Sequence, residues 1–308
     1  MSVLERRGHG DHAWIRFSAV NAGRISRVAG IWFPIAPMLL LFAGFLVTPL
    51  VMTAVLSFQE SDRSGQVLAT LTLENWREIV SDAYYRSIFA RTSRIALLVT
   101  VLAITLGAPE AYILNRMRPP WRSLLLLLVL TPLLISVIAR TLGWVLLFGP
   151  AGPLSHLPVF LRLTREPVAF LFTETGIIVA MTHVLTPFMV LSVWASLRRL
   201  DPRIEDAATS LGASRLTAFR RVVLPQILPG VLSGAIIVFA LAASAYATPL
   251  IIGGRRLKVA SVLVYDEFTH QMNWPLGAGL AMVLLLSLGL AMGAASRLVE
   301  RRYLEHGK

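Results

Sequence analysis

The side chains best suited to chemistry lie in the last quarter of the sequence, where two carboxylates stand among aromatic residues. Asp266 and Glu267 are followed closely by His270 and Trp274. Paired carboxylates beside aromatic rings suit the capture of a cationic amine, through charge attraction and cation–π contact. A solvated surface helix explains the same residues, so the substrate role and the surface role both stay open.

A second set of polar side chains falls inside long apolar stretches. Arg140 lies one helical turn before Trp144, and His183 lies near Pro187. Charged groups are costly in a bilayer, which makes each a functional hypothesis. Arg140 and Trp144 can line a solute pathway or anchor the chain at the outer interface, whereas His183 can face the pathway or bond a neighbouring backbone group. The candidate pathway residues are Arg140, Trp144, His183, Tyr246, Asp266, Glu267 and Trp274.

Known catalytic constellations are missing from the sequence. The Lys258 segment, GGRRLK, does not form a phosphate-binding P-loop, and neither an H-E-x-x-H pair nor a G-x-S-x-G elbow occurs. The chain has no cysteine, which excludes disulfides and thiolate metal sites. We therefore expect no catalytic residue, no metal site and no cofactor bound by this chain itself.

The composition is that of a protein in contact with lipid. The chain has 308 residues, of which 56% are hydrophobic and only 15% charged, whereas soluble domains are about 25% charged. A span needs about 20 mostly apolar residues. Stretches that meet this requirement predict an all-α, polytopic protein with six transmembrane helices, at roughly 31–58, 95–115, 123–148, 175–197, 228–252 and 277–296.

The basic residues indicate the orientation of these helices. Segments 1–30, 116–122, 198–224 and 297–308 carry 18 basic residues, and the alternate segments carry 10. Since cytoplasmic loops are enriched in Lys and Arg, both termini are predicted to be cytoplasmic. The net charge of +12 is then an orientation signal, and we expect no nucleic-acid partner.

The loop between the fourth and fifth spans is predicted to form two short helices. Asp201 can cap a helix that has Pro202 at its first position. Gly212 can end that helix in a left-handed conformation, and Ser214 can start the next. Pro225 stops or kinks the second helix at the membrane.

The same loop combines small and apolar side chains on a basic surface. Ala207 and Ala208 allow another backbone to approach closely, and Leu211, Leu216 and Phe219 give the loop an apolar face. Such a face suits a helix that lies in a partner's groove. A solvated basic loop that follows the charge rule for cytoplasmic segments is the alternative.

The spacing in this loop resembles the EAA loop of binding-protein-dependent ABC transporter permeases, whose consensus is EAA-x3-G-x9-I-x-LP. Here Asp206-Ala207-Ala208 is followed by Gly212, Val222 and Leu224-Pro225 at the expected intervals. Asp206 replaces the Glu, with Glu205 just before it, and Val222 replaces the Ile. ARTLGWVLLFGPAG at 139–152, YATPLIIGG at 246–254 and VYDEFTHQMNWPLGAGLA at 264–281 are similar to the spermidine/putrescine branch.

This resemblance implies a type I ABC importer permease fold in the cell inner membrane. It implies a second homologous permease, two ATPase subunits that hold ATP and Mg, and a periplasmic solute-binding protein, with membrane lipid around the spans. A polyamine is the implied solute. The implied ATPase-coupling residues are Glu205, Asp206, Ala207, Ala208, Gly212, Phe219, Leu224 and Pro225.

These observations define the expected domains and the alternatives. We expect a cytoplasmic tail at 1–30, a permease domain at 31–298 with its coupling loop at 198–225, and a second tail at 299–308. A secondary transporter of small amines or organic ions, working without ATPases, is the main alternative. It predicts inverted repeats and buried coupling carboxylates, of which only Glu110 qualifies. The other alternative is a membrane scaffold for a peripheral enzyme.

Overall fold

The computed structural model describes residues 36–62, 65–201 and 203–306, so the predicted tail at 1–30 lies outside the described residues. By its internal contacts the chain divides into a part up to Val55 and a part from Leu56 onward, which we describe separately. The described residues of the first part belong to the helix Ala36–Leu56, which ends at the boundary between the two parts. Its large apolar side chains, such as Phe42 and Phe45, are exposed, which is a surface suited to lipid.

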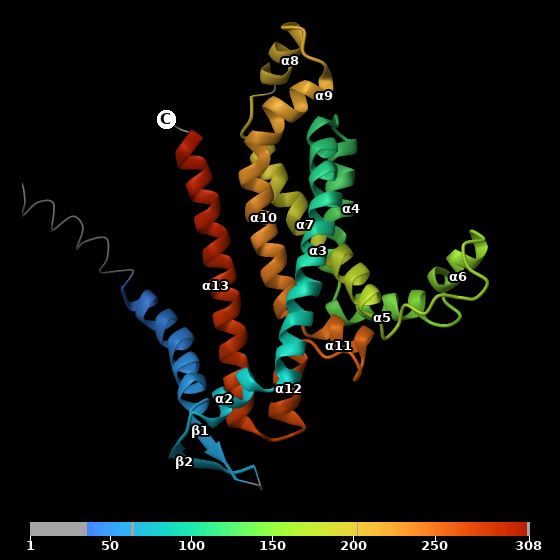
Figure 1. The fold of residues 1–308 in the computed structure, drawn as a ribbon. Coiled ribbons are helices and arrows are strands. Elements are labelled where there is room, and N and C mark those ends of the chain that lie inside the picture. Colours follow the sequence, from blue (N-terminus) through green and yellow to red (C-terminus); the bar gives the residue numbers. More distant parts are fainter. Residues whose placement is uncertain (1–35, 63–64, 202, 307–308) are drawn as a thin grey trace, which may run out of the picture. The chain divides into compact units, whose positions relative to one another are not determined.

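The second part is a bundle of helices with a short antiparallel hairpin at its start (Figure 1). Within the described residues of the chain, six helices are long and apolar enough to cross a membrane, which confirms the predicted number of spans. The elements in order are β1 (Gln59–Ser61), β2 (Val67–Leu71), α2 (Glu74–Ser81), α3 (Ala83–Arg116), α4 (Trp121–Leu134), α5 (Val137–Phe148), α6 (Pro153–Phe160), α7 (Glu174–Leu197), α8 (Arg203–Ser210), α9 (Arg215–Ala218), the π-helix η1 (Phe219–Val223), α10 (Leu224–Ser244), α11 (Ala247–Gly253), α12 (Ala260–Thr269) and α13 (Trp274–His306).

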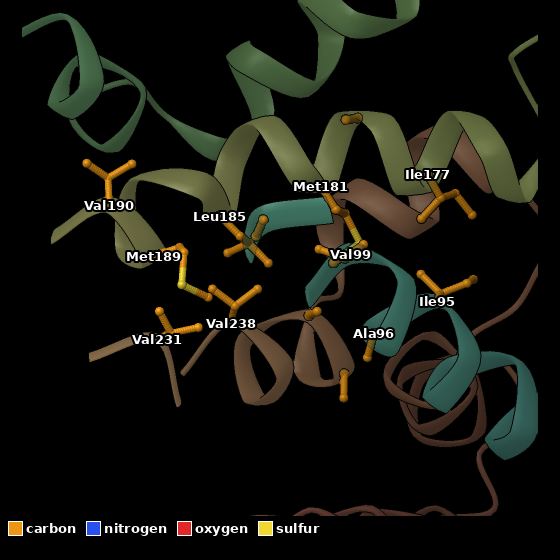
Figure 2. Close-up of a cluster of buried hydrophobic side chains, with 14 of the residues drawn as sticks. Ile95, Ala96, Val99, Ile177, Met181, Leu185, Met189, Val190, Val231 and Val238 are labelled. Carbon is orange, nitrogen blue, oxygen red and sulfur yellow. The ribbon is translucent and has the colours of Figure 1, made fainter. Parts of the chain in front are cut away.

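The main core lies where α3, α7 and α10 pack together. Figure 2 shows Val99 of α3, Leu185 of α7 and Val238 of α10 in one cluster of buried side chains. Gly230 and Gly234 bring α10 close to α7, since a Cβ at Gly230 would lie 2.3 Å from Ser196 Oγ. The similarly spaced Gly289 and Gly293 of α13 have no described atom within 4 Å of such a Cβ. Among the described residues, the Gly230–Gly234 pair is therefore a packing contact and the Gly289–Gly293 pair is not.

The third predicted span, 123–148, is not one continuous helix. The chain leaves helical conformation at Ile135 and Ser136, which separates α4 from α5. Pro132 sits in the last turn of α4 and supplies no backbone N–H, so the helix is already weakened there. The apolar segment beyond the break extends to Phe160 and comprises α5 and α6, which are separated by extended backbone at Gly149 and Gly152.

The fifth predicted span, 228–252, starts earlier and ends sooner than expected. The helical segment runs from Arg215 to Ser244, and the backbone becomes extended at Ala245 before α11 begins. Pro225 lies inside this continuous helical segment, directly after the π-helical turn Phe219–Val223, and its missing N–H removes one regular helical hydrogen bond there. The bend in this region is therefore at Ala245 rather than at Pro249, which lies inside α11.

A second buried cluster lies at the opposite end of the bundle from α8. It joins α2, α3, α12 and α13 through the apolar side chains of Ile79, Ile88, Leu263 and Leu280. Thr92 of α3 also accepts a hydrogen bond from the backbone N–H of Ala260, at 2.8 Å. These contacts close that end of the bundle within the chain itself.

Candidate functional site

The loop between α7 and α10 forms the two short helices that the sequence predicts. The Asp201 carboxylate accepts a hydrogen bond from the N–H of Arg203 at 2.9 Å, at the start of α8. Gly212 has a φ of +88°, and the N–H of Ala213 donates to the carbonyl of Ala208 at 3.1 Å, as in a Schellman motif. Ser214 accepts from the N–H of Thr217 and caps α9. The capping roles of Asp201, Gly212 and Ser214 are thus confirmed.

The junction between α9 and α10 is a π-helical turn. The N–H of Leu224 donates to the carbonyl of Phe219, five residues earlier, rather than four. Pro225 follows and has no N–H for a regular helical bond, which favours a widened turn before it. Leu224 and Pro225 thus fix the direction in which the loop re-enters the bundle.

The surface of α8 is open to solvent in this chain. No residue of α8 is buried, Asp206 and Ala207 are exposed, and Ala208 is half-buried. Leu211 is 90% exposed and Leu216 is 64% exposed. Phe219 departs from the predicted apolar face, because its ring packs inward against the Tyr112 ring, with centroids 4.9 Å apart. The face available to a partner therefore consists of Leu211 and Leu216, without Phe219.

Glu205 connects α8 to the neighbouring end of α3. Its carboxylate accepts a hydrogen bond from the Tyr112 hydroxyl at 3.1 Å and forms an ion pair with Arg116. The Arg116 guanidinium also lies over the Tyr112 ring, 4.6 Å from its centroid. Sequence reasoning did not identify Tyr112 and Arg116, although their spacing of four residues places them on one helix face. This four-residue spacing at the end of a predicted span is the sequence feature that could have identified the pair.

The carboxylates proposed for amine capture are engaged with other groups. Asp266 forms an ion pair with Lys258, and the imidazole of His270 lies 3.2 Å from its other oxygen. Burial lowers the pKa of Lys258, but the Asp266 hydrogen bond and nearby anionic groups raise it, and the net shift is upward. The ion pair is thus well formed at neutral pH.

Glu267 is the more buried member of this acidic pair, with 9% of its surface exposed. Burial raises the pKa of its carboxyl, Lys258 opposes that shift, and Asp266 and Glu78 add to it. Trp274 is exposed and meets the Phe268 ring edge-on, whereas Tyr246 packs on Tyr265 with ring centroids 4.7 Å apart. The structure therefore does not gather these residues around one open site.

Arg140, Trp144 and His183 lie near one another between α5 and α7. The Trp144 ring meets the imidazole of His183 edge-on, with centroids 5.4 Å apart. The Arg140 guanidinium donates to the Pro132 carbonyl, which lost its helical partner at the break after α4. In the described residues, the buried Arg140 Nε has no hydrogen-bond partner and no carboxylate forms an ion pair with Arg140. His183 is exposed and Arg140 is half-buried, so this group brings a guanidinium and an imidazole near one another.

Comparisons with known proteins agree with this geometry. A model of the binding-protein-dependent transport system inner membrane component family matches residues 98–305. The spermidine/putrescine transport system permease protein PotB of Haemophilus influenzae is 26% identical over 261 residues, which cover 84% of this chain and 91% of that protein. The putative 2-aminoethylphosphonate transport system permease protein PhnU of Salmonella typhimurium is 27% identical, covering 71% of this chain and 77% of that protein.

The fold is also similar to that of solved transporters. A chain in the crystal structure of a bacterial ABC transporter that imports the acidic polysaccharide alginate matches with a TM-score of 0.71. The two chains are 16% identical, and the match covers 91% of this chain and 98% of that one. At this identity the likeness concerns the arrangement of helices.

Proposed function

Because the chain belongs to the family of binding-protein-dependent transport system inner membrane components, we propose that it works as one of two homologous permease subunits, with two ATPases and a periplasmic solute-binding protein. The chain is a multi-pass inner-membrane permease component of an ABC importer, and ATP hydrolysis resides in partner subunits. This membership favours ATP-driven transport over the secondary transporter and scaffold alternatives. Alternating access then arises from rocking of the paired bundles.

The observation that best supports this assembly is the exposed surface of α8. A short helix, capped at its start and closed by Gly212, presents Asp206, Ala207 and Leu211 outward, and all three are exposed among the described residues. Contiguous exposed apolar patches mark protein interaction sites, and Leu211 and Leu216 are both exposed in this loop. The ATPase subunit is the partner that the family provides for this surface.

We propose a polyamine such as spermidine or putrescine as the solute. The support is the similarity to PotB, which is 26% identical over 84% of this chain. Capture of a cation by Asp266 would require Lys258 to release that carboxylate, and Glu267 is buried in this conformation. The pathway roles of Tyr246 and Trp274 stay predictions.

One observation favours a second candidate, a small amine that also bears an acidic group. The unpaired Arg140 beside His183 provides donors for an anion, because a guanidinium binds carboxylate or phosphonate oxygens in a bidentate manner. 2-Aminoethylphosphonate, the solute in the name of PhnU, has this chemistry. A polyamine has no group that would benefit from Arg140.

Reconstitution of the complete complex tests the assembly and separates the two solutes. The chain would be co-purified with a partner permease, an ATPase and a binding protein from the same organism, and placed in liposomes. We expect putrescine or spermidine on the binding protein to stimulate ATP hydrolysis and uptake. Failure of any ATPase to co-purify would contradict the proposed assembly, and stimulation by 2-aminoethylphosphonate alone would replace the polyamine with the second candidate.

Variants at Arg140 sharpen the choice of solute. If the solute carries an acidic group, Arg140→Gln lowers uptake by at least about tenfold, and Arg140→Lys, which keeps a cation, retains part of it. If the solute is a polyamine, both variants transport at rates close to the unmodified complex. Surface labelling of the inserted complex serves as the control for assembly.

A further inference from the structure

We propose that Glu205 is the residue that transmits motion of α8 into the bundle, by holding α8 to α3 through Tyr112 and Arg116. This inference rests on the proposed function, since it assumes that α8 meets an ATPase. It assigns different tasks to two neighbouring acids: Glu205 faces inward to its own chain, and Asp206 faces outward.

The contacts of Glu205 distinguish it from its neighbour. The Glu205 side chain is 17% exposed and reaches both the Tyr112 hydroxyl and the Arg116 guanidinium. Asp206, one residue later, is exposed, and within the described residues its carboxylate forms no ion pair. A hydrogen bond to a charged group is about twice as strong as a neutral one. The attachment of α8 is therefore concentrated on one carboxylate.

Apolar packing beneath α8 does not provide an equivalent attachment. A hollow lies between α8 and the ends of α3, α7 and α10, lined by Ile204, Glu205, Tyr112, Leu200 and Gln226. No α8 side chain is buried. The polar contact spans this incompletely filled space, so its loss leaves α8 joined to the bundle mainly through its chain connections.

The helix that receives this contact extends across the whole bundle. α3 has 34 residues, which corresponds to a length of about 50 Å. Toward its other end, Arg94 forms an ion pair with Glu174 of α7, and Thr92 accepts a hydrogen bond from the N–H of Ala260 of α12. A displacement of α8 that pulls on Tyr112 and Arg116 therefore acts on a helix attached to α7 and α12.

The Tyr112 ring adds a second contact to this connection. It packs edge-on against Phe219 in η1, so α3 meets both the start and the end of the loop. While Glu205 is bound, α8 and η1 are consequently both held to α3. This arrangement predicts that removing the carboxylate charge separates ATPase docking from transport, rather than abolishing docking.

The test uses the complete complex in liposomes and the variants Glu205→Gln and Arg116→Gln. We expect each to keep the ATPase in the purified complex and to lower binding-protein-stimulated ATP hydrolysis and uptake by about fivefold to tenfold. Tyr112→Phe, which keeps the ring and removes the hydroxyl, has a smaller effect. Glu166→Gln, an exposed acid far from α8 in sequence, is the matched control and transports normally.

A double-mutant cycle tests whether Glu205 and Arg116 act through their shared contact or stabilise the loop independently. Because both side chains act through one contact, Glu205→Gln with Arg116→Gln is expected to be no worse than the more affected single variant. Additive losses, unchanged stimulation in Glu205→Gln, or loss of the ATPase from its complex would each overturn the inference. A lack of stimulation in the unmodified complex would instead count against the proposed function.

Discussion

The two ends of the bundle differ in how many of their side chains are buried within the chain. At the α12 end, helices α2, α3, α12 and α13 share a buried apolar cluster, and ion pairs such as Lys258–Asp266 and Arg94–Glu174 lie around it. At the α8 end, the outermost helix buries no side chain and is held by Glu205. Leu211 and Leu216 point away from the bundle there.

This difference indicates which end depends on another protein. At the α12 end, Ile79, Ile88, Leu263 and Leu280 are buried within the same chain and Asp266 is paired with Lys258, so this cluster forms without a partner protein, although Leu71 and Trp274 are exposed there. Exposed leucines on a short helix become favourable when a partner removes them from water. We infer that the α12 end keeps its structure in the isolated chain, whereas the α8 end acquires its full set of contacts on assembly.

The largest expected effect follows from breaking the turn that shapes the α8 end. Proline holds φ near −65°, whereas Gly212 has a φ of +88°. Gly212→Pro should lower binding-protein-stimulated ATP hydrolysis by at least about tenfold, because the turn between α8 and α9 cannot form. Membrane insertion and the thermal unfolding of the α12 end should be unaffected.

Asparagine provides the matched control at this position, since it tolerates a left-handed backbone better than other non-glycine residues. Space is not limiting, because a Cβ at Gly212 would have no described atom within 4 Å. Gly212→Asn should therefore retain most of the stimulated hydrolysis. Equal activity of the proline and asparagine variants would show that the turn is not required.

An intermediate effect is expected where the α8 end is joined to the core. A Cβ at Gly230 would lie 2.8 Å from the Ser192 carbonyl oxygen, on a backbone that cannot move aside easily. Gly230→Val should destabilise the bundle by about 1–3 kcal/mol, measured as a lower midpoint of thermal unfolding in detergent. Gly289→Val, on the open side of α13, should leave the isolated chain unchanged, and similar losses in both would contradict the tight α7–α10 contact.

The smallest effect concerns pH at the α12 end. Burial raises the pKa of Glu267 above its usual value of 4.5, so the folded chain binds this proton more tightly than the unfolded chain does. The stabilisation from this proton is complete below about pH 4.5 and is lost as pH rises through the raised pKa. Glu267→Gln should remove that part of the pH dependence and raise the melting temperature slightly at pH 7.

Thermal unfolding from pH 4 to pH 8 measures this effect, and Glu166→Gln on an exposed loop is the control for a lost charge. A parallel pH profile for Glu267→Gln and the unmodified chain would contradict the assigned burial. Transport itself should change less than stability, because Glu267 lies at the α12 end of the bundle, away from the proposed ATPase contact at α8.

Features set by local chemistry were largely predictable from the sequence. Apolar runs gave the number of spans, and the capping residues Asp201, Gly212 and Ser214 gave the two short helices. These features depend on neighbours within a few residues, where spacing carries the information. The third span was the exception, since its apolar run continues across the break after Pro132 and conceals it.

Contacts between segments that are far apart in the chain could not be predicted from the spacing of residues in the sequence. Glu205 meets Tyr112 across 93 residues, and nothing in the loop itself distinguishes the inward acid from the outward one. The pairing of Asp266 with Lys258 likewise removed an apparently free carboxylate. Both contacts depend on which helix faces pack together.

The sequence by itself determined six apolar spans, a basic loop between the fourth and fifth of them and the caps of the helices in that loop, because hydrophobic length, charge bias and turn chemistry are local properties. Only the tertiary structure decided that Glu205 is bound to α3, that Asp266 is paired, and that Arg140 lacks an acidic partner among the described residues. Side-chain partners are chosen by the packing of α3, α5, α7 and α12, which brings together groups that the chain order keeps far apart.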